Sequence, residues 1–379
     1  MKLAIIVPAW PPQLDGIGDY SARLASVFSI SNQVVVFTAE DRVVSPIEGV
    51  RMVQCFQWTH PRSNWQLLDH LRNERPDWAI VQYNPFSWGL RGFNMQLPRV
   101  LRRMRDFTKV AVMFHERYFA PVTNLRGAMM AGYQRWQYRQ LVTVADLSLY
   151  STEPWLADHQ RRFPAKPAYH LPVGSNIPLA DGSHEVTRRT LGIDPDTLVL
   201  GLFGSAHVSR LLDWIHLAAG KLQATGRKTL LLYIGPHQQA VVSAMRGIPV
   251  RCVGVLAAEE VSRHLRAVDI FLSPFADGVS TRRGSFIAAL QHGLATVGTE
   301  GESTGPLLAS HCGQAFILTP CDSPDAFVAA VLRVVAEPDL RRSLEQKSVQ
   351  LFQTVFSWEQ IASRLTQILQ RGDTPREIA

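Results

Sequence analysis

Short apolar runs alternate along this chain with longer stretches in which apolar residues recur every three or four positions. The runs are rich in Val, Ile and Leu and end at turn residues, which predicts buried strands of parallel sheets separated by helices. We expect strands over residues 3–7, 33–38, 78–82, 110–114 and 147–150, and again over 198–203, 229–234, 250–253, 270–273 and 295–298. A helix is expected over residues 20–28.

The alternation is interrupted once, by the segment PVGSNIP at residues 172–178. Its prolines, glycine and small polar residues predict a linker. The pattern on both sides predicts the α/β class, with two consecutive doubly wound, Rossmann-like domains over residues 1–175 and 176–355. Because such domains bind ligands at the carboxyl ends of their strands, we expect the ligand site in a crevice between them.

Composition agrees with two folded domains. The chain has 379 residues, of which 46% are apolar and 19% charged, which excludes a disordered or collagen-like protein. Its four cysteines are scattered singly, without a CxxC pair, so neither structural zinc nor a disulfide framework is expected. The apolar run at the N-terminus ends at Pro8, and no run reaches 18 apolar residues. We therefore expect a cytoplasmic protein without a signal peptide or spanning helix.

The positive charge is concentrated in the first half of the chain. The 39 Lys and Arg exceed the 32 Asp and Glu by seven. Residues 1–180 hold 20 of these basic residues and 13 of the acidic ones, which accounts for the whole excess. Two stretches, 99–105 and 126–139, are rich in Arg, and the second also holds Met, Tyr and Trp. This pattern is typical of a solvated helix face, of contact with an anionic membrane or lipid-linked acceptor, or of nucleic-acid binding. No nucleic-acid module signature is present, so no nucleic-acid partner is expected.

A glycine-containing loop follows the first predicted strand. Gly16, Gly18 and Ser21 form a degenerate GxGxxG pattern, in which glycines let a backbone approach an anion at a helix start. In a dinucleotide-binding fold the first glycine directly follows the strand, whereas here residues 8–15 intervene. A plain turn and an anion-binding loop both remain open.

Polar residues follow the strand at 110–114. The sequence His115-Glu116-Arg117-Tyr118 lies at the carboxyl end of this strand, where side chains of a parallel sheet face the ligand crevice. A lone histidine is more often structural, but this cluster of four favours a site.

Two loops of the second domain have the composition of a phosphate site. The strand at 198–203 leads into a small-residue turn that contains Ser205 and ends at Arg210. A second loop carries Asp277, with Ser280, Arg282, Arg283, Gly284 and Ser285. A helix is predicted to start near Gly284 and stop at Gly293. Two arginines and hydroxyls at a helix N-terminus favour a diphosphate, and the alternative is a capped helix with solvated arginines.

The pair Asp194 and Asp196 matches the DxD pattern of metal-dependent transferases. It precedes the strand at 198–203 and encloses Pro195, so we interpret it as a turn at the wrong end of the sheet for the crevice. No metal and no cofactor are expected.

In their order and spacing these motifs resemble the family-4 retaining glycosyltransferases of the GT-B fold. The resemblance covers nearly the whole chain. Its landmarks are the loop with Gly16 and Gly18, the strand end at His115, the linker at 172–177, the loop at 204–210, the strand ending at Pro274, the helix ending at Gly293, and the sequence FSWE at 356–359. It implies two Rossmann-like domains facing a central cleft, with the C-terminal segment 356–379 packing back on the N-terminal domain.

The resemblance also implies a reaction. The C-terminal domain would bind a nucleotide-sugar, and the N-terminal domain a saccharide or lipid-linked saccharide acceptor. The sugar would pass to an acceptor hydroxyl with retention. The basic N-terminal half adds the hypothesis of a lipid-linked or membrane-proximal acceptor, as in cell-surface polysaccharide or glycolipid assembly, with peripheral contact at the inner membrane face. The alternatives are a nucleotide-sugar epimerase or phosphorylase on the same scaffold, a non-catalytic nucleotide-sugar-binding partner protein, and an NAD-dependent dehydrogenase.

Individual roles follow from the matched positions. Donor-binding residues would be Gly16, Gly18, Ser205, Arg210, Ser280, Arg282, Arg283, Gly284 and Ser285. Acceptor-binding residues would be Asp19, Tyr20, Glu116, Arg117 and Tyr118, and His115 would contact the sugar near the reacting carbon. Ser205 stands where the family has Arg, and Arg210 where it has Lys. Ser280 and Ala288 replace the two glutamates of the Glu-x7-Glu motif, which leaves Asp277 as the nearest carboxylate and a candidate catalytic residue.

Overall fold

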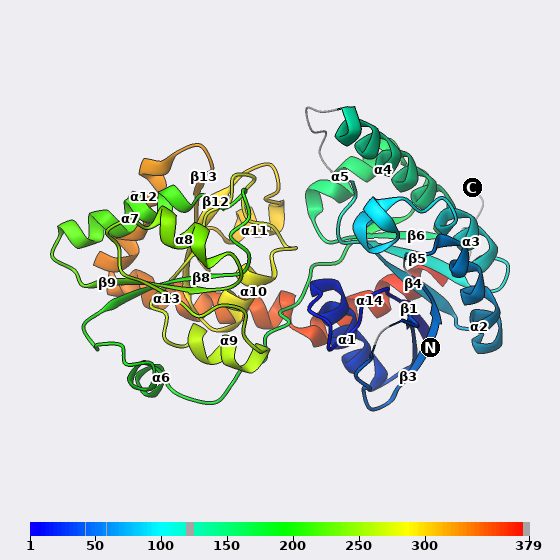
Figure 1. Cartoon of the computed structure of the whole chain (residues 1–379), viewed down its shortest axis with the longest axis horizontal. Coiled ribbons are helices and arrows are strands. Elements are labelled where there is room, and N and C mark those ends of the chain that lie inside the picture. The colour runs from blue at the N-terminus through cyan, green and yellow to red at the C-terminus, as the bar shows by residue number, and fades with distance from the viewer. Residues whose placement is uncertain (42, 58, 119–124, 374–379) are drawn as a thin grey trace. The chain divides into compact units, whose positions relative to one another are not determined.

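The computed structural model describes residues 1–379 except 42, 58, 119–124 and 374–379, and it divides into two compact units (Figure 1). Unit 1 comprises residues 1–151, 155–172 and 358–379, and unit 2 comprises 152–154 and 173–357. The sequence places the first boundary after residue 175, and the structure divides the chain after Pro172, since the Val173 amide already donates to Thr281 O of unit 2 at 3.0 Å.

Unit 1 is built on a seven-stranded parallel sheet in the order β3-β2-β1-β4-β5-β6-β7. The strands are β1 (Lys2–Ile6), β2 (Gln33–Ala39), β3 (Val50–Phe56), β4 (Trp78–Tyr83), β5 (Lys109–Phe114), β6 (Leu147–Tyr150) and β7 (Ala168–His170). The helices are α1 (Gly16–Ser29), α2 (Gln66–Glu74), α3 (Leu97–Met104), α4 (Leu125–Val144), α5 (Glu153–Arg162) and α14 (Trp358–Asp373). Helices α2, α3 and α4 cover one face of the sheet, and α1 and α14 pack together on the other (Figure 1).

Unit 2 has a six-stranded parallel sheet in the order β10-β9-β8-β11-β12-β13. The strands are β8 (Leu198–Phe203), β9 (Thr229–Ile234), β10 (Val250–Cys252), β11 (Ile270–Ser273), β12 (Ala295–Glu300) and β13 (Ile317–Pro320). The helices are α6 (His184–Thr190), α7 (Leu212–Ala224), α8 (Gln238–Ala244), α9 (Ala258–Leu265), α10 (Gly284–Gln291), α11 (Pro306–His311), α12 (Pro324–Ala336) and α13 (Pro338–Leu351). A π-helical turn, Phe352–Phe356, follows α13.

The predicted α/β class and the doubly wound pattern are confirmed. The central strands are mostly apolar because helices cover both faces of each sheet, and every residue of β4 and of β11 is buried, including the polar Gln82 and Ser273. Helix α10 begins at Gly284, and Gly293 follows its end with φ +65°, as predicted. Strands β3, β7 and β13 were missed. Each lies at the edge of its sheet and is partly exposed, so it lacks the continuous apolar run.

The C-terminal helix α14 belongs to unit 1. Trp358, at its start, packs against Tyr20 of α1 with ring centroids 5.2 Å apart, and Ile361, Leu365 and Leu369 are buried. The sequence places this returning segment at 356–379, of which 374–379 lies outside the described residues. Among the described helices none is both long and apolar enough to cross a bilayer.

Candidate functional site

The strand order of unit 2 creates a switch point between β8 and β11. Successive strands run outward from β8 on one side and from β11 on the other, which is where doubly wound sheets leave a crevice at the carboxyl ends. The loops that follow these two strands are joined by an antiparallel bridge between Arg210 and Phe275. The Ala276 amide also donates to Ser209 O at 2.8 Å. Topology therefore brings the two predicted phosphate loops together.

We refer to the place where the loops after β8 (residues 204–211) and after β11 (residues 274–283) meet as the Arg210 junction. Arg210 lies at its centre. Only 6% of the residue is exposed, and its guanidinium lies 4.4 Å from the centre of the Phe275 ring. Nη2 donates to Phe203 O at 2.6 Å and, more weakly, to Ser285 Oγ at 3.4 Å. Nε and Nη1 are buried without a hydrogen-bond partner among the described residues. Burial, and secondarily the charge of Arg283, lowers the pKa of Arg210 to about 9.

Arg283 approaches the same aromatic ring. Its guanidinium lies 4.0 Å from the centre of Phe275, and Nη2 donates to both carboxylate oxygens of Asp277 at 2.7 and 2.9 Å. Ser303 Oγ donates to Asp277 Oδ2 at 2.9 Å, and Arg282 lies 3.8 Å from the same oxygen. Asp277 therefore fixes Arg283 in place. The sequence did not predict this arrangement, because no motif pointed to its other members, Ser303 and Phe275.

The other predicted donor residues surround this junction. A Cβ atom on Gly204, which has φ +100°, would come within 3.2 Å of Arg210 Nη2 and 3.6 Å of Ser285 Cβ. Gly284 is exposed at the start of α10, and no described side chain caps that start. Ser280 is fully buried, and its hydroxyl has no partner among the described residues. The junction thus combines two guanidiniums, an uncapped helix start and a glycine without a side chain.

Ser205 lies at the rim of the junction. It is exposed, and its hydroxyl is 3.3 Å from His237 Nδ1. His237 has a left-handed backbone, with φ 65°, and directly precedes α8. No sequence motif singles out His237, because its proximity to Ser205 depends on the loop after β9.

In unit 1, His115 follows β5 as predicted. Its Nε2 lies 2.7 Å from Gln82 Oε1 of the neighbouring strand β4, and its ring meets the edge of Tyr20 at 4.8 Å. Burial lowers the pKa of His115 to about 3, so the ring is neutral at physiological pH. Gln82 was missed by sequence reasoning, since it lies inside an apolar strand 33 positions away.

Tyr20 and Asp19 lie in the first turns of α1. Tyr20 is 2% exposed, and its hydroxyl is buried without a partner among the described residues. Asp19 is partly buried, and burial together with the charge of Asp15 raises its pKa. Both residues therefore lie on the helix that starts in the glycine loop. Of the two, Tyr20 contacts His115.

The residues after His115 are held by unit 1 itself. Arg117 donates to Asp158 Oδ2 at 2.7 Å, and its guanidinium lies 5.2 Å from the Tyr118 ring and 5.1 Å from the Trp155 ring. Tyr118 packs against the core of the unit. Glu116 is partly buried. The cluster predicted from the sequence is therefore divided: His115 faces α1, whereas Arg117 and Tyr118 pack toward α5 and α4.

The glycine loop starts α1. Asp15 caps the helix by accepting from Ile17 N at 2.9 Å and Gly18 N at 2.7 Å. A Cβ on Gly18 would lie 2.9 Å from Ala9 O, so this glycine is required for the packing of the loop on itself. Gly16 is exposed, and a Cβ there would meet nothing within 4 Å. The close backbone approach at Gly18 is therefore to the chain itself, whereas Gly16 lies at the surface.

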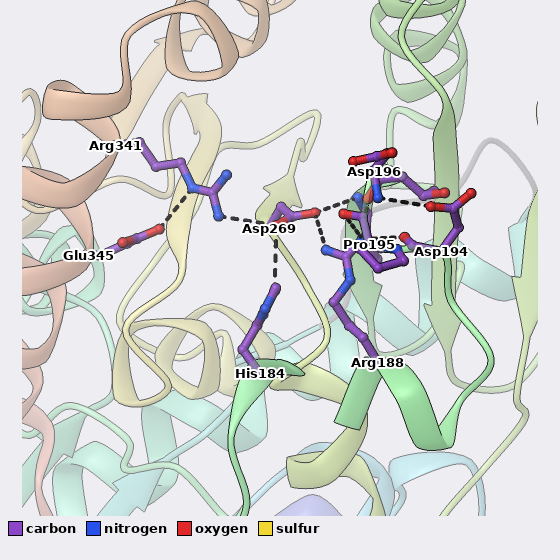
Figure 2. Close-up of polar contacts among 10 residues, drawn as sticks. His184, Arg188, Asp194, Pro195, Asp196, Asp269, Arg341 and Glu345 are labelled. Carbon is purple, nitrogen blue, oxygen red and sulfur yellow. Dashed lines mark hydrogen bonds and ion pairs between the residues drawn. The ribbon is translucent and has the colours of Figure 1, made fainter. Parts of the chain in front are cut away.

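The DxD pattern forms a turn, as predicted. Asp194 Oδ1 accepts from Asp196 N at 3.0 Å, Asp194 O accepts from Thr197 N at 3.0 Å, and Lys228 Nζ lies 2.9 Å from Asp194 Oδ2. Figure 2 shows Arg188 donating to the turn carbonyls, among them Asp194 O at 3.1 Å.

The same view shows a buried charge cluster around Asp269, which directly precedes β11 (Figure 2). Its carboxylate accepts from Arg188 at 2.9 Å, from Arg341 at 3.1 Å and from Val199 N at 2.7 Å, and His184 lies 3.5 Å away. Burial by itself would raise the pKa of Asp269, but these hydrogen bonds and cations lower it to about 2. The cluster ties α6 and α13 to the amino end of the sheet, opposite to the Arg210 junction.

Comparison with known proteins agrees with this architecture. Residues 197–337 match the family model described as "Glycosyl transferases group 1", and no curated protein sequence matches the chain. Sucrose-phosphate synthase from Thermosynechococcus elongatus superposes with a TM-score of 0.75 at 16% identity, over 98% of this chain and 98% of that chain.

Two further structures are similar over their whole length. WaaG, a glycosyltransferase involved in lipopolysaccharide biosynthesis, gives a TM-score of 0.70 at 15% identity over 97% of this chain and 99% of its own. Anabaena HepE, solved in complex with UDP and glucose, gives a TM-score of 0.69 at 11% identity over 98% of this chain and 100% of its own. The expected GT-B fold class is confirmed, and the family match lies within unit 2.

Proposed function

We propose that the protein is a glycosyltransferase that moves a sugar from a nucleotide-sugar to an acceptor hydroxyl with retention of configuration. One observation carries this proposal, the guanidinium of Arg210, buried with Nε and Nη1 unpaired beside a second guanidinium, Arg283. A buried guanidinium with two unpaired nitrogens and no carboxylate partner among the described residues is costly, and an anion bound at the junction would offset that cost. The diphosphate of a nucleotide-sugar has the required charge and size.

Donor binding would use the groups that converge at the junction. Arg210 and Arg283 would donate to phosphate oxygens, and the first amides of α10 at Gly284 and Ser285 would add a favourable helix dipole. Gly204 leaves room because it has no side chain beside Arg210. Arg283 would supply the cation that is lost where Ser205 stands. HepE, which shares the fold, was solved with UDP bound, which supports a donor of this class.

The same groups would stabilise the transition state. As the bond from the anomeric carbon to the phosphate oxygen breaks, negative charge grows on the diphosphate, and the two fixed guanidiniums stabilise it. The acceptor hydroxyl attacks the oxocarbenium-like carbon from the face that the phosphate leaves, and the leaving phosphate accepts the hydroxyl proton. No step uses Asp277, whose carboxylate is held by Arg283 and Ser303, so we assign it a positioning role.

Unit 1 would serve the acceptor. His115, neutral because of burial, would orient a hydroxyl through a hydrogen bond and would not act as a general acid. We propose a saccharide or lipid-linked saccharide as acceptor, in polysaccharide or glycolipid assembly at the cytoplasmic face of a membrane. The involvement of WaaG in lipopolysaccharide biosynthesis supports this class. No metal ion or cofactor takes part in this scheme.

The test begins with a thermal-shift screen of UDP-, GDP-, ADP- and TDP-sugars, with nicotinamide dinucleotides as controls. The nucleotide-sugar that raises the melting temperature is then incubated with candidate acceptors, and the products are analysed by NMR. We expect a glycoside with the donor's anomeric configuration, and an Arg283→Ala variant that is at least about tenfold slower. An inverted product would refute retention, and an unchanged rate for that variant would refute the donor site.

A second candidate function is supported by Ser280 and Ala288, which stand where the resembling family has two glutamates. It is a nucleotide-sugar-binding protein without turnover, acting as the partner of another transferase. Donor binding without product on any acceptor would favour it. Conversion of the sugar in the absence of an acceptor would instead identify an epimerase.

A further inference from the structure

Exposed apolar side chains are concentrated on one part of unit 1. Large apolar residues on the surface of a monomeric protein are usually scattered singly, but here seven of the described residues within 51 positions of the chain are large, apolar and exposed. They are Phe86, Leu90, Phe93 and Met95 in the segment after β4, and Leu125, Met129 and Trp136 on α4. We refer to these seven residues as the apolar face.

Helix α4 presents three large apolar residues to solvent on one side, with Gly132 between the second and the third. Leu125, Met129 and Trp136 recur at helical spacing on one side and are 77%, 67% and 40% exposed. The opposite side, including Ala131, Tyr138 and Leu141, is buried in the core. Apolar side chains on the solvent side of a helix, in addition to those on its core side, indicate that the solvent side contacts a second apolar environment.

The segment after β4 lies directly against α4. Phe93 contacts Tyr133 with ring centroids 4.5 Å apart, Tyr133 contacts Trp136 at 5.5 Å, and the Tyr133 hydroxyl accepts from Asn94 N at 2.9 Å. The two parts of the apolar face therefore form one surface. Because these contacts fix the 86–95 segment on a helix, its exposed side chains are presented by a rigid support.

Arginine predominates among the charged residues of this region. Residues 78–105 and 117–145 contain nine arginines and no lysine, aspartate or glutamate. Three of these arginines, Arg103, Arg105 and Arg117, pair with the carboxylates of Asp106, Asp146 and Asp158 just outside these ranges. Arg126, Arg135 and Arg139 are exposed on α4 and flank its exposed apolar residues. Apolar side chains bordered by guanidiniums match the interface of a bilayer, where acyl chains lie beneath anionic phosphates.

We propose that the apolar face and its flanking arginines dock unit 1 on an anionic lipid bilayer. Leu125, Met129 and Trp136 insert among the lipid headgroups, and Arg126 and Arg139 contact lipid phosphates. A nucleic acid is a poorer match, since Leu90, Met95, Leu125 and Met129 offer aliphatic groups where bases require stacking surfaces. The proposal does not depend on the transferase assignment, because docking is measured without donor or acceptor.

The experiment is co-sedimentation of the full chain with phosphatidylcholine vesicles and with vesicles that also contain phosphatidylglycerol. We expect binding to the anionic vesicles only, weakened by salt. Leu125→Gln/Met129→Gln and Arg126→Gln/Arg139→Gln should each weaken binding by about tenfold or more. The matched controls, Leu217→Gln/Val242→Gln and Arg227→Gln/Arg246→Gln, change exposed residues of unit 2 and should bind as the unaltered chain does.

Melting temperatures of all variants establish that they fold, which the high exposure of the substituted residues favours. Three results would overturn the proposal: no sedimentation with anionic vesicles, equal sedimentation with neutral ones, or unchanged binding of both face variants. A dimer in analytical ultracentrifugation that Leu125→Gln/Met129→Gln abolishes, in a chain that ignores vesicles, would assign the face to a second copy instead.

Discussion

Replacing Arg210 by Met should leave unit 2 at least as stable as before while it removes donor binding. Methionine preserves most of the side-chain volume against Phe275 and removes the charge. Most buried substitutions destabilise a protein by about 1 kcal/mol. The opposite sign expected here follows from the environment of the guanidinium, which has two unpaired nitrogens and a neighbouring cation in Arg283.

The sign follows from the pKa. Burial and the charge of Arg283 lower the pKa of Arg210 to about 9, so the site disfavours the charged form by several kcal/mol, at about 1.4 kcal/mol for each pKa unit. The hydrogen bond to Phe203 O and the contact with Phe275 offset part of this cost, at about 2 kcal/mol or less each. Arg210→Met removes the charge and keeps an apolar contact with Phe275, so the free energy of unfolding of unit 2 should stay unchanged or rise by about 1 kcal/mol.

Hydrogen exchange of peptides from β8 and β11 measures the free energy of unfolding within unit 2 alone, so unfolding of unit 1 does not contribute to the result. Arg227→Met, at an exposed position of the same unit, is the control and should leave exchange unchanged. The reasoning would be refuted if Arg210→Met destabilised unit 2 by more than about 2 kcal/mol and still bound the nucleotide-sugar, because Arg210 would then be a structural residue.

Three further predictions concern other residues. Asp277→Asn should raise the donor KM about threefold to tenfold through Arg283 with little change in kcat, and a loss of kcat above about a hundredfold would restore a catalytic role. Because the folded pKa of Asp269 is lowered to about 2, it contributes about 2 kcal/mol above pH 4 that is lost as the pH falls toward 2. Asp269→Asn should abolish that dependence in hydrogen exchange of β11 and cost about 3 kcal/mol at neutral pH, whereas the exposed Asp194→Asn should do neither. The His115 ring should show no NMR titration between pH 5 and 8, since its pKa lies near 3, and a midpoint in that range would contradict its burial.

The sequence was sufficient for the central strands, because residues covered on both faces must be apolar and form uninterrupted runs. It was insufficient for β3, whose exposed positions include Arg51 and Gln54, and for the edge strands β7 and β13. The edge strand β10 was predicted. Helix α10 could be placed because Gly293 ends it in a left-handed conformation that favours glycine.

The candidate site was predictable only in part. The proximity of Arg210 and Arg283 could be predicted, since both follow strands that end at one edge of the sheet. The pairing of Asp277 with Arg283 and Ser303 could not, because it depends on how the loop after β12 folds back. Gly18 has a packing role that the glycine pattern alone did not reveal, since a Cβ there would lie 2.9 Å from Ala9 O.

The central claim is that the Arg210 junction binds a diphosphate, and titration calorimetry tests it most directly. The nucleoside diphosphate of the donor found in the thermal-shift screen should bind at least about tenfold more tightly than its monophosphate, because each phosphate that meets a fixed guanidinium adds about 1.5–3 kcal/mol. In Arg210→Met this difference should disappear, while Arg227→Met should keep it. Equal affinities for the two nucleotides, or an unchanged difference in Arg210→Met, would contradict the account.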